Sequence, residues 1–231
     1  MGPRQEHFRM MALYNQWANA RLYAATGRIA PEALAADHGA FFGSLLGTLN
    51  HLLVTDRLWT SRLEGVSPRG TRLDEMLHHD FDDLLAARRA QDHKLVDYVH
   101  GFGEECFATP LDYATSSGAP QSQPLHHVLA HLFNHQTHHR GQAHHLVGLA
   151  LGREATPVLD LLAYQRSTGA AAAAGDAQHG ATRLRNDGPP RPPTEDGFER
   201  LRGTAIPVGA ADAGGEMRAD KEVPEPDSLG G

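Results

Sequence analysis

The chain has 231 residues, a formal net charge of −7 and a single cysteine, Cys106. One cysteine excludes an intrachain disulfide scaffold, which fits a cytoplasmic protein. We find no signal-peptide pattern at the N-terminus and no apolar run of the length a membrane span needs. The acidic balance is mild and argues against nucleic acid as a partner.

The apolar content is divided unevenly along the chain. Residues 1–167 carry nearly all of the periodic apolar pattern, whereas residues 168–231 hold 11 of the 24 Gly and 7 of the 14 Pro. A segment of that composition buries too little apolar surface to offset the entropy lost on ordering. The sequence therefore predicts one domain over 1–167, followed by a low-complexity, disordered tail over 168–231.

Two helices are predicted in the first third of the chain. The first runs from about Arg4 to Ile29 and stops before Pro31. After a short linker, the second runs from about Ala40 to Glu64, and Gly65 follows its end. One side of this second helix is apolar and consists of Phe41, Leu45, Leu49, Leu52 and Trp59.

The rest of the domain continues the helical pattern with one interruption. A third helix is predicted from about Phe81 to His100, and residues 104–124 suit a small hairpin or ordered loop with a turn at Ser117-Gly118. The fourth helix spans about Leu125 to Leu151, and a short helix near Val158–Tyr164 closes the domain. Four long helices without a strong strand pattern predict an all-α fold, a four-helix bundle.

A histidine pair on the fourth predicted helix is the main functional signal. His135 and His139 are four residues apart, which on a helix is about 40° of rotation and about 6 Å of rise. The apolar arc of this helix consists of Val128, Leu132, Ala143 and Leu146. His139 falls within this arc and His135 lies at its edge. A core-facing imidazole needs a hydrogen-bond partner or a metal ion. His131 and His138 flank the arc and are alternative members of the pair.

His51, in the middle of the second predicted helix, is a candidate third partner. It is flanked by Thr48 and Thr55 instead of large apolar groups, which is typical of a pocket floor. Three imidazoles would leave at least one coordination position open, as in catalytic metal sites. The expected cofactor is one divalent ion, for which Zn²⁺, Ni²⁺, Fe²⁺ and Mn²⁺ all suit imidazole ligands.

Three further residues could support this site. Asp56 could accept a hydrogen bond from an imidazole N–H, or pair with Arg57 or Arg140. Arg140 could bind an anionic substrate group, although an ion pair within the protein is the favoured interpretation. Gln142 lies on the same arc as His135 and could line the pocket.

The segments His51–Trp59 and Asn134–Gln142 resemble the two signature regions of the DinB-like metal-binding helical bundles, and Tyr14–Asn19 resembles the opening of their first helix. The resemblance covers about residues 5–165. It implies a bundle with a crossover connection, which is often dimeric. It also implies a divalent ion held by one histidine of the second helix and a His-x-x-x-His pair of the fourth, here His51, His135 and His139.

Some members of that family transfer low-molecular-weight thiols such as bacillithiol or mycothiol. The leading hypothesis is therefore a metal-dependent thiol S-transferase that acts on a small-molecule substrate and forms a homodimer. A metal-dependent hydrolase is a second hypothesis, and it ranks lower because the chain has no His-Glu-x-x-His motif. A metal-binding stress protein without turnover is the third.

Overall fold

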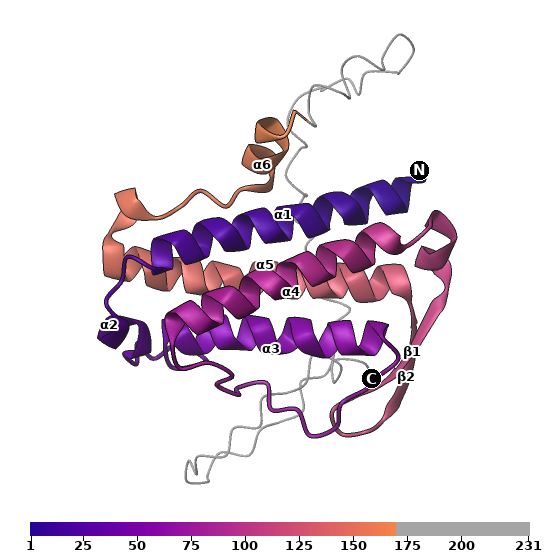
Figure 1. Ribbon diagram of the computed structural model, residues 1–231, viewed down its shortest axis with the longest axis horizontal. Coiled ribbons are helices and arrows are strands. Elements are labelled where there is room, and N and C mark those ends of the chain that lie inside the picture. Colours follow the sequence, from indigo (N-terminus) through magenta and orange to yellow (C-terminus); the bar gives the residue numbers. More distant parts are fainter. Residues whose placement is uncertain (170–231) are drawn as a thin grey trace, which may run out of the picture. The chain divides into compact units, whose positions relative to one another are not determined.

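The computed structural model of the protein describes residues 1–169, and the predicted tail lies outside this range from residue 170 onward. Four long helices, α1, α3, α4 and α5, form the bundle (Figure 1). The helical elements are α1 (Pro3–Thr26), α2 (Pro31–Ala35), α3 (Leu45–Leu63), α4 (Phe81–Gly101), η1 (Glu104–Ala108), α5 (Leu125–Leu151), η2 (Arg153–Ala155) and α6 (Leu161–Ser167). The predicted all-α bundle is confirmed. Within residues 1–169, no helix has both the length and the apolar character needed to span a membrane.

The four long helices do not follow one another around the bundle. Helix α1 packs against α4 and α5, and α3 packs against the same two helices. The C-terminus of α4 lies beside the N-terminus of α1, where Gln5 Nε2 donates to the Phe102 carbonyl oxygen. Helices α3 and α4 consequently run in one direction, and α1 and α5 run in the other (Figure 1).

Parallel neighbours need a long connection, and residues 64–80 provide it between α3 and α4. This crossover segment packs along the outer side of α3, where Leu73 is buried against Val54 and Leu58. Helix α3 is covered on nearly all sides as a result. The crossover that the family resemblance implies is thereby present, and it brings the Leu73 backbone next to His51.

The structure differs from the predicted elements before α3. The linker after Pro31 contains the short helix α2, and α3 begins at Leu45, five residues later than predicted from Ala40. Ser44 caps α3 by accepting a hydrogen bond from the Gly47 backbone N–H. Phe41 was wrongly placed on the apolar side of this helix. It lies in the preceding loop and is 60% exposed.

Strands β1 (Pro110–Ala114) and β2 (Pro120–Pro124) form the predicted hairpin before the last long helix. They pair antiparallel, with Pro110 opposite Pro124 and Ala114 opposite Pro120. Gly118 adopts a φ of 90° in the turn, a conformation that favours glycine. The hairpin carries the chain from the end of α4 across the end of the bundle to the start of α5.

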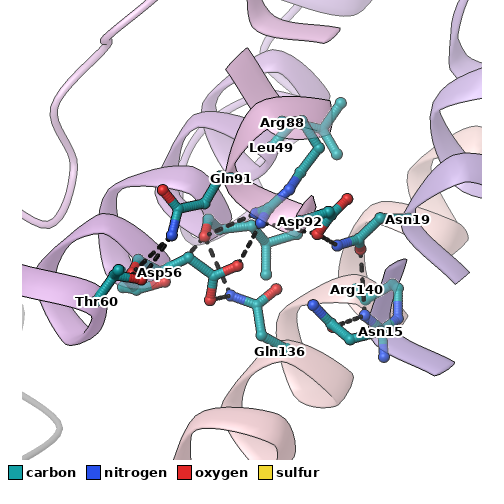
Figure 2. A network of polar contacts seen from close by, with 12 residues as sticks. Asn15, Asn19, Leu49, Asp56, Thr60, Arg88, Gln91, Asp92, Gln136 and Arg140 are labelled. Atoms are coloured by element: carbon teal, nitrogen blue, oxygen red, sulfur yellow. Dashed lines mark hydrogen bonds and ion pairs between the residues drawn. The ribbon is translucent and has the colours of Figure 1, made fainter. Parts of the chain in front are cut away.

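The core contains two large apolar clusters and a layer of buried polar side chains, which Figure 2 shows from close by. The centre of this layer is Arg88 on α4, which is 1% exposed. Arg88 Nη2 lies 2.6 Å from Asp56 Oδ2 on α3 and 2.9 Å from Asp92 Oδ1 on its own helix. One guanidinium thus serves two buried carboxylates.

The same layer reaches the other two long helices. On α5, Gln136 Nε2 donates to Asp56 Oδ1 and, at 3.1 Å, to the Leu52 carbonyl oxygen. On α1, Asn19 Nδ2 donates to Asp92 Oδ1 at 2.9 Å. All four long helices therefore share one hydrogen-bonded network, and their relative register is fixed by it.

We predict that Arg88→Met lowers the free energy of unfolding by about 3 to 5 kcal/mol at neutral pH, because it leaves buried carboxylates without a cation. Burial already raises the pKa of Asp92 to about 6, against the lowering effect of Arg88. A carboxyl whose folded pKa exceeds its unfolded pKa destabilises the fold as pH rises through the folded value. The loss in Arg88→Met should therefore shrink between pH 7 and pH 5, as measured by urea unfolding.

The control is Arg72→Met, which breaks an exposed ion pair with Asp74. Solvent screens that pair, so no measurable change is expected. Equal effects of the two substitutions, or a loss in Arg88→Met that does not depend on pH, would contradict the network's role.

Candidate metal centre

Three imidazoles meet between α3 and α5. His51 is buried on α3 and is 2% exposed, while His135 and His139 on α5 are half-buried. One nitrogen from each ring lies within 4.8 Å of the other two. His51 Nε2 and His135 Nε2 are 3.3 Å apart. The packing of α3 on α5 thus joins residues that are far apart in sequence.

Hydrogen bonds on the far side of two rings set their orientation. His51 Nδ1 lies 2.8 Å from the Leu73 carbonyl oxygen, which can only accept. His139 Nδ1 lies 2.8 Å from Gln142 Oε1, which also accepts. Both rings therefore carry their proton on Nδ1 and present the Nε2 lone pair toward the cluster.

The loop before α3 closes one side of the cluster. The Phe42 ring stacks on His51 with a centroid distance of 3.9 Å and meets His139 edge-on at 5.4 Å. The position of the Phe42 backbone requires glycine at residue 47, because a Cβ atom there would collide with the Phe42 carbonyl oxygen. Phe42 thus gives the cluster an apolar wall.

The surroundings keep the imidazoles neutral. Burial lowers the pKa of His51 to about 4, despite the opposing effect of the Leu73 hydrogen bond. Burial also lowers the pKa of His135, and the neighbouring His139 and His51 add to this effect. Burial lowers the pKa of His139 as well. Neutral imidazole is the form that binds metal ions.

The arrangement fits a divalent cation. Tetrahedral coordination with Zn–N bonds of about 2.0 to 2.1 Å implies nitrogen atoms about 3.3 Å apart. The separation of His51 Nε2 and His135 Nε2 matches this value, and the ligand nitrogen of His139 lies within 4.8 Å of both. A group of three neutral nitrogen donors could hold such an ion and would leave a position for a further ligand.

Two of the three predicted supporting residues, Asp56 and Arg140, have different roles from those expected. Among residues 1–169, the Asp56 carboxylate contacts Arg88 and Gln136 directly and no imidazole. Burial raises the pKa of Asp56, and the more distant Arg140 opposes this rise only through its charge. The Leu73 carbonyl oxygen has the acceptor role that the sequence predicted for Asp56.

In the part of the chain that the structure describes, no carboxylate lies within ion-pair distance of Arg140, although the charges of Asp56 and Asp92 oppose the lowering of its pKa by burial. Arg140 is 2% exposed, and its Nη1 donates to the side-chain oxygens of Asn15 and Asn19. It also lies over the Tyr14 ring, 5.2 Å from the centroid. Arg140 is thus part of the buried polar layer.

Gln142, in contrast, lies where the sequence pattern suggested, beside the cluster. The alternative histidines stand next to it: His131 is 5.9 Å from His135 and His138 is 4.7 Å from His139 by ring centroids. His138 is exposed. Among residues 1–169, the only group of three or more ligand-type side chains that could hold an ion is His51, His135 and His139.

Residues 4–179 match the family model of the DinB family. The chain belongs to the DinB family. The resemblance inferred from the sequence motifs is thereby confirmed, and the histidine cluster is consistent with its metal-binding aspect. No curated protein and no solved structure matches this DinB-family chain.

The hydrogen bonds of His51 to Leu73 and of His139 to Gln142 predict the tautomers of these two rings in the metal-free protein. Nitrogen NMR of the histidine rings should show His51 and His139 as Nδ1–H tautomers with bare Nε2 atoms. In Gln142→Leu, His139 loses its acceptor and should shift toward the Nε2–H form, whereas His51 should not change. An Nε2–H signal from His51 in the unaltered protein would contradict this orientation of the cluster.

Proposed function

We propose that this protein binds one divalent metal ion through His51, His135 and His139 and uses it in thiol S-transfer to a small-molecule electrophile. The convergence of three neutral imidazole nitrogens between α3 and α5 carries the proposal. Membership of the DinB family supports it. The choice of a thiol as co-substrate rests on the family resemblance alone.

A bound divalent ion would supply Lewis acidity, which favours the thiolate form of a thiol placed at its open position. The protein contributes the geometry. Leu73 and Gln142 fix the rings of His51 and His139, and Phe42 shields the cluster from water on one side.

In the reaction, the thiol sulfur forms a C–S bond with the electrophilic carbon, and the leaving group departs with its bonding electrons. The thiol proton passes to solvent. The open side of α5 near His138 and Gln142, which line a cavity of about 450 Å³, offers room for the substrate.

The metal part of the proposal predicts about one ion per chain in the purified, untagged protein. His51→Ala, His135→Ala and His139→Ala should each lose the ion after dialysis, while remaining helical by circular dichroism. His127→Ala is the matched control, because His127 is exposed on the same helix. Elemental analysis gives the result, and full metal content in His139→Ala would contradict the assignment.

The enzymatic part predicts turnover that needs both the ion and a thiol. Bacillithiol, mycothiol and glutathione would be compared against an activated aryl halide and an epoxide. Loss of activity is expected in His139→Ala, and in the chelated protein until metal is restored. Ester or amide hydrolysis without added thiol would favour the hydrolase instead, and a metal-loaded protein inactive in both assays would favour a binding protein without turnover.

The homodimer and the cytoplasmic location stay predictions of the sequence. Light scattering coupled to size-exclusion chromatography would test the first.

A further inference from the structure

A second cavity lies on the other side of the bundle, between α1, α4 and α6. Its volume is about 490 Å³, which is within the range of small-molecule sites. Aromatic rings form much of its wall: Trp17, Tyr23 and Tyr164. The histidine cluster, in contrast, lies between α3 and α5, so this cavity does not belong to the candidate metal centre.

A buried carboxylate with an unused oxygen lines this cavity. Asp92 is 4% exposed, and its Oδ1 accepts from Asn19 and lies 2.9 Å from Arg88 Nη2 (Figure 2). Its Oδ2 accepts no hydrogen bond from residues 1–169, and this atom is not fully enclosed by protein. This oxygen is therefore partly accessible, and Asp92 is one of the residues that line the cavity. A buried carboxylate oxygen without a donor is costly, unless a ligand or water supplies one.

The aromatic wall is suited to positive charge. Trp17 and Tyr164 lie 5.5 Å apart by ring centroids, and Tyr14 packs behind both. The Arg21 guanidinium already lies over the Trp17 ring at 4.9 Å. Ring faces attract cations, and more strongly where water is excluded.

We propose that this cavity is a binding site for an organic ammonium ion with a short apolar or aromatic body. The ammonium group would donate to Asp92 Oδ2, and the body would pack between Trp17, Tyr164 and Leu85. The site is independent of the proposed metal chemistry.

The charges around the cavity are compatible with a cation. Arg88 also lines it, and its guanidinium is shared between Asp56 at 2.6 Å and Asp92 Oδ1 at 2.9 Å, so one cation faces two carboxylates. Arg89 and His93 stand at the rim and are exposed, so solvent screens them. Burial raises the pKa of Asp92 to about 6, so the carboxylate is ionised in assays above that pH.

The test is isothermal titration of the full chain with 2-phenylethylammonium chloride. The protein would be stripped of metal by chelation, because an amine could otherwise bind a metal ion. Saturable binding at one site per chain is expected. The neutral analogue 2-phenylethanol and the anion 3-phenylpropionate should bind about tenfold more weakly or not at all, because they lack the charge-assisted hydrogen bond to Asp92.

Two variants separate the site from general effects on folding. Asp92→Asn keeps an oxygen that can accept from Asn19 but removes the charge, and it should weaken binding about tenfold or more. Ala20→Phe places a ring in the cavity from an exposed position on α1, so the fold should tolerate it while binding is lost. Ala24→Phe is the matched control, one turn further along α1 and outside the cavity, and should bind normally.

The proposal is overturned if the ammonium ion does not bind. It is also overturned if the neutral analogue binds equally well, or if Ala20→Phe binds like Ala24→Phe. Each result concerns the metal-free protein, so none depends on the outcome at the histidine cluster.

Discussion

The burial of Arg88 is the constraint on which the rest of the structure depends. A guanidinium that is 1% exposed must be surrounded by acceptors, and Asp56 and Asp92 provide the charge. Asp56 in turn binds Gln136, the residue that follows His135 on α5. The register of α5 against α3 is thus set one residue away from the histidine cluster, which is how a charge deep in the core can position the metal centre.

The candidate site combines elements that the chain brings together by three separate routes. Helix packing places His51 opposite the α5 pair, the crossover segment supplies the Leu73 carbonyl oxygen, and the loop before α3 supplies Phe42. None of these groups carries charge. Neutral nitrogen donors whose orientation is already fixed favour the binding of a metal cation. With three such donors, the cation keeps a coordination position open for a further ligand.

The sequence predicted the bundle, the hairpin and the bounds of α5, because apolar periodicity and proline and glycine signals are local. It also predicted the three histidines, through helical spacing for the α5 pair and through family resemblance for their register. It missed α2, Phe42 and Leu73, and it did not identify Arg88 and Gln136 as the direct partners of Asp56. Those roles depend on which segments meet across the bundle, and a backbone carbonyl such as that of Leu73 leaves no mark in the residue pattern.

X-ray absorption spectroscopy of the zinc-loaded protein tests the central claim most directly. The account predicts three imidazole nitrogens at about 2.0 to 2.1 Å and at least one exchangeable light-atom ligand. Addition of a thiol should replace that ligand with sulfur at about 2.3 Å. Four imidazoles around the ion, with His131 or His138 as the fourth and no response to thiol, would show a closed structural site and contradict the account.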